Sequence, residues 1–108
     1  MIYNILATPR FKKRLKKLFK KYPSIKNDVL ELSKKLASDP TLGTSLGNDC
    51  YKIRLAITSK AKGKSGGARV ITYIAIIQET VYLIAIYDKS DKSTISDNEI
   101  LELLTEIE

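Results

Sequence analysis

The stretch that decides the fold is CYKIRLAITSKAKGKSGGARVITY, residues 50–73. Its first part alternates in character from residue to residue, which is the pattern of a half-buried β-strand. One face carries Tyr51, Ile53, Leu55 and Ile57, and the other carries Lys52, Arg54, Ala56 and Thr58. A loop rich in Lys, Gly and Ser follows, and a second apolar strand opens at Arg69. If the two strands pair as a hairpin, Arg69 joins Lys52 and Arg54.

Residues 50–78 form a positively charged segment that contains no acidic side chain. Its basic residues are Lys52, Arg54, Lys60, Lys62, Lys64 and Arg69. The whole chain carries a net charge of +7, but residues 79–108 hold eight acidic residues against two basic ones. An unneutralised positive surface attracts polyphosphate, so the sequence predicts a nucleic-acid partner.

Length and composition limit the classes of protein. A chain of 108 residues that is 44% hydrophobic predicts one small domain over residues 1–108. The start of the chain has no apolar run of signal-peptide or transmembrane length, so the expected location is cytoplasmic, with no membrane partner. With no histidine and one cysteine, Cys50, the common zinc sites are excluded, and no metal or cofactor is expected. Cys50 is expected to be a small buried filler.

A helical hairpin is predicted before the basic segment. An edge strand at residues 2–7 leads to Thr8, a helix N-cap, and to Pro9 at the first helical position. Pro23 interrupts this first helix, and Ser24 is predicted to cap the second. The tight connection makes the pair antiparallel. The first helix also carries eight cations: Arg10, Lys12, Lys13, Arg14, Lys16, Lys17, Lys20 and Lys21.

Two more strands follow the basic loop. Residues 41–49 are predicted to be a loop, and residues 70–77 and 81–87 are strands joined by a three-residue turn. Since both strands are apolar on both faces, they are placed in the middle of the sheet, with the helices covering one face.

The chain ends in a polar loop and a helix. Residues 88–94 are predicted to be the loop, and Ser96 and Glu99 form a capping box that opens the helix. The predicted fold class is α+β: a mainly antiparallel, four-stranded twisted sheet with a helical hairpin on one face and the C-terminal helix packed beside it.

Four motifs together resemble a known family. They are KIRLA at residues 52–56, GKSGGARVI at 63–71, YDK at 87–89 and S-x-x-E at 96–99. This combination is similar to the RelE/ParE superfamily of type II toxins, specifically the HigB-like branch. The resemblance implies a RelE-like toxin that enters the ribosomal A site and cuts mRNA. It also implies a cognate antitoxin, for which a helix-turn-helix protein with an acidic segment is expected.

The resemblance carries site residues over by position: Lys52, Arg54, Arg69, Tyr87 and Lys89, with Lys62 and Lys64 from the GKSGG loop. Cleavage by a 2′-OH needs a base, an acid and positive charge at the phosphate, without a metal. Crowding by other cations lowers a lysine's pKa, so Lys52, Lys62 or Lys64 suits the proton transfers, and which of them acts stays open. Arg69 suits the stabilisation of negative charge on the phosphate. Tyr87 could stack on a base, and Lys89 could bind a phosphate.

Several alternatives remain open at this stage. An alternative interpretation of Lys52 and Arg54 is that they form the solvated face of a half-buried strand. The corresponding alternative for residues 59–67 is that they form a soluble hairpin tip without a site. The first helix's cations are interpreted as a solvated or ribosome-facing surface. Ser90 and Ser96 stand where RelE proper has an arginine and a tyrosine, and Ser90-Asp91 where the HigB-like branch has Asn-Glu. The alternative functions are a ParE-like, non-enzymatic inhibitor of DNA gyrase and a catalytically degenerate RNA-binding module. Cations clustered around Arg69 favour the nuclease.

Overall fold

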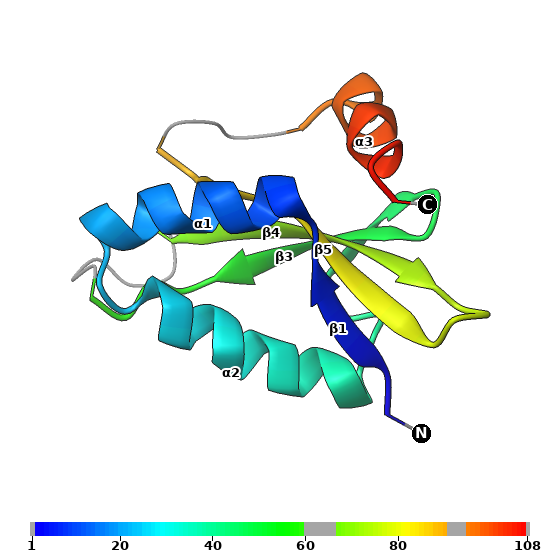
Figure 1. Ribbon diagram of the computed structural model, residues 1–108, viewed down its shortest axis with the longest axis horizontal. Coiled ribbons are helices and arrows are strands. Elements are labelled where there is room, and N and C mark those ends of the chain that lie inside the picture. Colours follow the sequence, from blue (N-terminus) through cyan, green and yellow to red (C-terminus); the bar gives the residue numbers. More distant parts are fainter. Residues whose placement is uncertain (1, 60–66, 91–94, 108) are drawn as a thin grey trace.

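The protein is built on a five-stranded sheet that has helices on both faces (Figure 1). The structure is a computed structural model, and it describes residues 2–59, 67–90 and 95–107. The strand order is β1-β5-β4-β3-β2. β1 pairs in parallel with β5, and the other pairs are antiparallel, as predicted. The elements are β1 (Asn4–Ala7), α1 (Pro9–Lys21), α2 (Ile25–Ser38), β2 (Thr44–Gly47), β3 (Cys50–Leu55), β4 (Ala68–Ala75), β5 (Thr80–Asp88) and α3 (Asp97–Leu104).

The sheet has five strands and not the predicted four, because β2 lies inside the segment expected to be a loop. β2 is a four-residue edge strand that pairs with β3 through Thr44–Lys52 and Ser45–Tyr51. Its sequence, TSLG, has no β-branched residue after the first and ends in glycine, so its propensity is weak. The two-residue connection, Asn48-Asp49, has φ of 54° and 59°. Two consecutive left-handed residues make a tight hairpin turn, and Asn-Asp was a signal for one.

The two apolar strands lie inside the sheet, as predicted, but β4 is shifted along the chain. It ends at Ala75 and not at residue 77. Ile76 and Ile77 lie in the turn to β5 and are 60% and 99% exposed. Periodicity alone assigns two isoleucines to a strand, whereas the turn is fixed by Glu79, whose φ is 49°.

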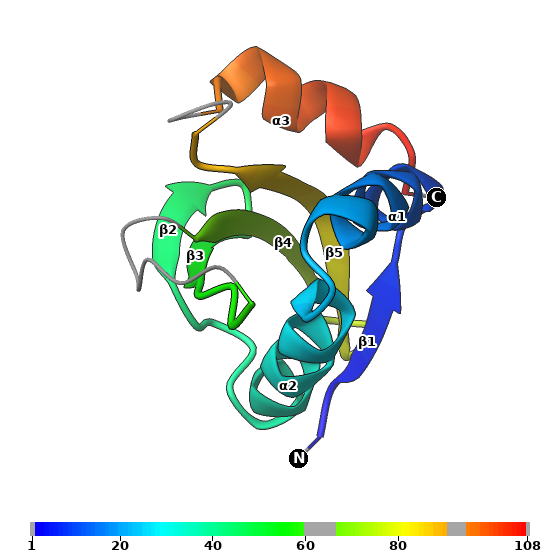
Figure 2. The same cartoon turned by 90° about the vertical axis from the view of Figure 1, so that its left-hand side faces the viewer.

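Helices lie on both faces of the sheet, α1 and α2 on one and α3 on the other (Figure 2). A separate apolar cluster lies on each face. On one face, α1 and α2 pack on β3, β4 and β5 through residues that include Phe11, Ile25 and Leu36, each at most 1% exposed. Burying one such side chain stabilises the fold by about 2 kcal/mol. On the opposite face, Ile100 and Leu103 of α3 pack on the sheet. α3 therefore covers the face opposite to the helical hairpin, and Arg10 of α1 forms ion pairs with Glu102 of α3 and with Glu106, which follows α3.

A β-bulge in β5 decides which way the end of that strand faces. Ile71 pairs with Ala85 and Thr72 with Leu83, so one residue of β5, Ile84, is extra. Ile84 and Ala85 both belong to the cluster under α3. The bulge shifts the alternation by one residue beyond this point, so that Tyr87 also faces α3.

No helix in the described ranges 2–59, 67–90 and 95–107 is long and apolar enough to cross a membrane.

Candidate active site

Arg54, Arg69 and Tyr87 lie side by side in a row across three strands. Arg54 of β3 pairs with Arg69 of β4, and Arg69 pairs with Tyr87 of β5. Residues paired across a sheet point to the same face, which here is the face that α3 covers further along. This cation row joins two of the residues predicted from the basic segment to a third from the YDK motif. The bulge in β5 is what brings Tyr87 into it.

The two arginines of the cation row repel each other. Like charges directly opposite on neighbouring strands are destabilising, and Arg69 is only 6% exposed, which adds a desolvation cost. Its Nη1 donates a hydrogen bond to the Ala68 carbonyl oxygen at 3.2 Å. In the described part of the chain, no carboxylate forms an ion pair with Arg54 or Arg69. The row is therefore suited to binding an anion between or above its guanidinium groups.

Tyr87 is buried beside Arg69, with 5% of its surface exposed. Burial raises the pKa of its phenol above the usual value, while the positive charge of Arg69 lowers it and the carboxylate of Glu99 raises it further. The phenol therefore keeps its proton at neutral pH. A side chain so enclosed presents no open ring face, so its burial favours a role in positioning Arg69 over stacking on a nucleobase.

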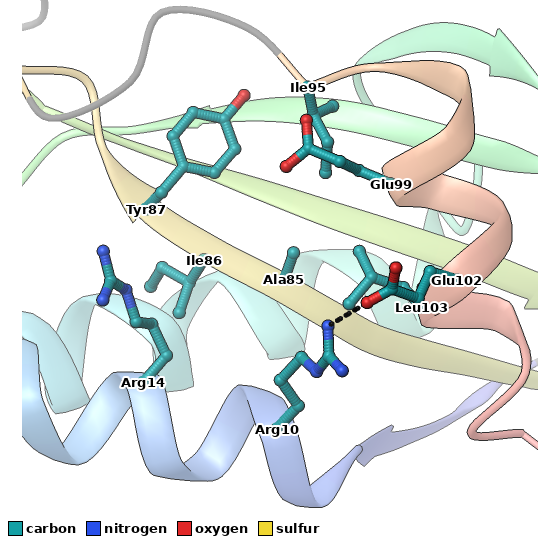
Figure 3. Close-up of a pocket in the computed structure, with 9 residues that line it drawn as sticks. All are labelled: Arg10, Arg14, Ala85, Ile86, Tyr87, Ile95, Glu99, Glu102 and Leu103. Atoms are coloured by element: carbon teal, nitrogen blue, oxygen red, sulfur yellow. Dashed lines mark ion pairs between the residues drawn. The ribbon is translucent and has the colours of Figure 1, made fainter.

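A pocket of about 230 Å³ lies between α1, β5 and α3, with Tyr87 in its wall (Figure 3). Glu99 and Ile95 reach it from the α3 side, and Arg10 and Arg14 from α1. Arg10 forms an ion pair with Glu102 at 3.7 Å, which bridges the two helices. The pocket shares only Tyr87 with the cation row, so it flanks the row and does not contain it.

The predicted lysines are placed unevenly. Lys52 is partly exposed one row from Arg54, on the same face, and pairs with Ile71. Lys89 follows β5 and is exposed, and its backbone N–H donates to the Gly67 carbonyl oxygen at 3.2 Å. Lys62 and Lys64 lie outside the described residues. Lys52 therefore lies next to the cation row, two residues from Arg54 along β3, and Lys89 lies two residues beyond Tyr87.

Asp28 holds the beginning of the basic loop against α2. Its carboxylate accepts hydrogen bonds from the Thr58 N–H at 3.0 Å, from the Thr58 hydroxyl at 2.6 Å and from the Ser24 hydroxyl at 2.8 Å. Ser24 is the N-cap residue of α2, as predicted, although its side chain makes no capping hydrogen bond. Its hydroxyl serves this anchor instead and also contacts the Ser59 hydroxyl at 2.9 Å.

Asp88 anchors the end of β5, next to Tyr87. The sequence analysis missed this role, because it placed Asp88 in a polar loop. It is the last residue of β5 and is 0% exposed. The Tyr22 hydroxyl donates to its Oδ2 at 2.5 Å and the Ser90 N–H to its Oδ1 at 3.0 Å. An aspartate after an apolar run is typical of a loop, so only its place between Tyr87 and Lys89 in the YDK motif pointed to it.

Gly67 explains part of the GKSGG motif. A Cβ at this position would lie 2.3 Å from the Leu55 carbonyl oxygen, far inside contact distance. Glycine thus lets the start of β4 approach the end of β3, which sets Arg69 opposite Arg54.

Cys50 is a buried filler, as predicted, with 0% of its surface exposed. Burial and the neighbouring Asp49 carboxylate raise its pKa to about 11. The thiol is therefore un-ionised at neutral pH and is not a nucleophile.

Comparisons with known proteins agree on the fold and the family. The structure is similar to that of an arginine-to-alanine double mutant of the E. coli toxin RelE in the free state, with a TM-score of 0.67 and 18% sequence identity over 100% of both chains. At that identity, the likeness shows a shared fold. The family model of the RelE toxin of the RelE/RelB toxin-antitoxin system matches residues 9–106. The RelE/ParE assignment is confirmed, and the HigB-like branch stays a prediction. The chain belongs to the RelE toxin family.

Proposed function

We propose that this toxin is an endoribonuclease that cuts mRNA in the ribosomal A site. The observation that carries the proposal is the cation row, in which Arg54 and Arg69 face each other without an acidic partner in the described part of the chain. Such an arrangement costs stability in the free protein, and a phosphate would relieve it.

The proposed reaction is an internal transfer of the phosphoryl group. The 2′ oxygen attacks the adjacent phosphorus and gives its proton to a base, while the bond from phosphorus to the 5′ oxygen breaks and that oxygen receives a proton from an acid. The products are a 2′,3′-cyclic phosphate and a 5′-hydroxyl. Negative charge gathers on the phosphorane oxygens in the transition state, and fixed guanidinium groups stabilise it there.

The residues divide into two groups. Arg54 and Arg69 stabilise the phosphorane, because a guanidinium stays charged and binds phosphate oxygens through two parallel hydrogen bonds. Tyr87 is a positioning residue that holds the Arg69 side chain from one side. The proton transfers fall to lysines, with Lys52 on the same face as the row, and Lys62 and Lys64 assigned from the motif. Lys89 is proposed to bind a neighbouring phosphate.

The partner follows from the family, since the toxin of a toxin-antitoxin system has an antitoxin. That the antitoxin is a helix-turn-helix protein, and that it covers the site with an acidic segment, stay predictions from the charge of residues 50–78.

Cleavage that depends on the ribosome is the test of this function. The purified toxin is incubated with a defined mRNA, either free or bound to ribosomes with an empty A site, and primer extension locates the cuts. Cuts are expected within the A-site codon on ribosome-bound message, with free message left intact. Growth arrest by the toxin with intact message in both samples would favour the gyrase inhibitor or the degenerate RNA-binding module.

A further inference from the structure

The pocket between α1, β5 and α3 lies where the edge of β5 has no neighbouring strand. β1 pairs with β5 only as far as Leu83, so the rest of β5 is open on that side. The pocket lies beyond this point, with Ala85, Ile86 and Tyr87 in its wall. It is therefore built on a strand edge, and α1 and α3 form its two sides (Figure 3).

The main chain of Ile86 directs its hydrogen-bonding groups toward this pocket. In an antiparallel pair, alternate residues exchange hydrogen bonds with the partner strand. The Lys89 N–H donates to the Gly67 carbonyl oxygen, so Tyr87 and Ala85, which are in phase with Lys89, bond to β4. The N–H and C=O of Ile86 therefore point away from β4. Within the described ranges, β1, the helices and the loops make no hydrogen bond to these two groups, although Ile86 is only 2% exposed. A ligand that supplies both a donor and an acceptor would satisfy them.

Two side chains of opposite charge reach the pocket from different helices. Arg14 reaches it from α1, and Glu99 from α3 (Figure 3). The other cation of the lining, Arg10, is engaged in ion pairs with Glu102 and Glu106. Among the described residues, no carboxylate forms an ion pair with Arg14. Glu99 is held in place by the capping box, since its Oε1 accepts the N–H of the N-cap residue at 3.0 Å.

We propose that this pocket binds one nucleobase of the message, that guanine is preferred there, and that the pocket thereby selects the codons that are cut. The inference rests on the proposed function, because a base bound beside Tyr87 belongs to a nucleotide next to the phosphate on the cation row. The volume of about 230 Å³ is below the range of pockets for drug-sized ligands, and it suits a single ring system. Ile86 and Leu103 offer apolar surface to the faces of the ring.

The three edges of guanine match the three polar groups of the pocket. An arginine binds the O6 and N7 acceptors of guanine through two hydrogen bonds, which is the role of Arg14. The N1–H and the N2 amino group donate to a carboxylate, here that of Glu99. On the third edge, N3 lies beside the second hydrogen of the amino group, which suits the N–H and C=O of Ile86. Adenine carries an amino group where guanine has O6, so it would set a donor against the Arg14 guanidinium.

An isolated phosphate or an acidic peptide fits the same pocket less well. The carboxylates of Glu99 and Glu102 lie in its lining and repel an anion. A phosphate dianion also has no donor for the Ile86 carbonyl oxygen, which would stay buried without a partner. The mixed charges of the pocket therefore favour a neutral base with donors and acceptors.

The test combines base analogues in the message with one variant of the pocket. Ribosomes with an empty A site hold messages in which each nucleotide flanking the scissile phosphate is in turn guanine, hypoxanthine, which lacks the N2 amino group, or 2-aminopurine, which lacks O6. Single-turnover cleavage rates are measured for wild type and for Arg14→Gln. The control is Lys13→Gln, because Lys13 is an exposed cation of the same helix that does not line this pocket. Glutamine, lysine and arginine have similar helix propensities.

At one of the two positions, wild type is expected to cut the guanine message about 10- to 100-fold faster than the 2-aminopurine message. R14Q should remove this advantage by slowing cleavage of the guanine message while leaving the 2-aminopurine rate unchanged. Hypoxanthine keeps O6, so R14Q should slow its message by the same factor as the guanine message. K13Q should keep the wild-type pattern.

Equal wild-type rates for all bases at both positions would overturn the inference. So would a fall by one common factor for every base in R14Q, which would mean that Arg14 contacts the phosphate backbone. In either case, cleavage by the wild type shows that the proposed function stands by itself. If wild type cuts none of the messages, the proposed function fails and the inference fails with it.

Discussion

Replacing Arg69 with methionine, R69M, is expected to slow cleavage by about 10²- to 10³-fold and to leave the protein at least as stable as wild type. Methionine fills a similar volume and removes a charge that is 6% exposed and faces Arg54. Exchanging a buried charge for a well-packed apolar group is often neutral or stabilising. Single-turnover cleavage on ribosome-bound message and thermal unfolding measure the two effects.

Arg69→Lys is the matched control for geometry. It keeps the positive charge but loses the two parallel donors of the guanidinium, so an intermediate rate is expected. Full activity of a folded R69M protein would remove Arg69 from the site. Unfolding of R69M would instead mean that the charge is needed for the fold, and the repulsion argument would be wrong.

Replacing Asp88 with alanine is expected to lower the free energy of unfolding by about 3 kcal/mol. The change leaves the Tyr22 hydroxyl and the Ser90 N–H without their buried acceptor and opens a cavity at a position that is 0% exposed. Tyr22→Phe is the control, because it removes one of these bonds and keeps the ring, so its cost should be about 1 kcal/mol. Urea denaturation measures both. Equal losses for the two variants would show that Asp88 acts through Tyr22 alone.

Much of the fold is readable from the sequence because local signals and burial agree. Alternation from Tyr51 to Ile57 placed one face of β3 correctly in the cluster under α1 and α2. Ser96 and Glu99 form the predicted capping box, with both hydrogen bonds present. The strand β2 was missed because its pairing comes from the Asn48-Asp49 turn and not from its own residues. The bulge at Ile84 could not be predicted, because it lies in a run of apolar residues whose pattern does not reveal an extra residue.

The sequence predicted which charged residues of the candidate site lie together, but it did not predict how deeply the neighbouring residues are buried. The basic segment fixed Arg54 and Arg69 as neighbours, since hairpin pairing follows from the strand pattern. The exposure of Tyr87 depends on where α3 docks, and that of Asp88 on where Tyr22 at the end of α1 meets β5, and no local pattern gives either position. Hence Tyr87 and Asp88, which the sequence analysis placed at the end of a strand and in a polar loop, are 5% and 0% exposed. A strand end next to a helix is buried by tertiary packing, which residue type alone does not reveal.

The most direct test of the central claim, that the cation row promotes attack by a 2′-OH, is a ribosome-bound message with one 2′-deoxy sugar at the scissile nucleotide. The deoxy message should resist cleavage completely, while the all-ribose message gives upstream fragments that end in a 2′,3′-cyclic or 3′-phosphate, identified by mass spectrometry. Cleavage of the deoxy message, or fragments that begin with a 5′-phosphate, would show that water is the nucleophile and would contradict the account.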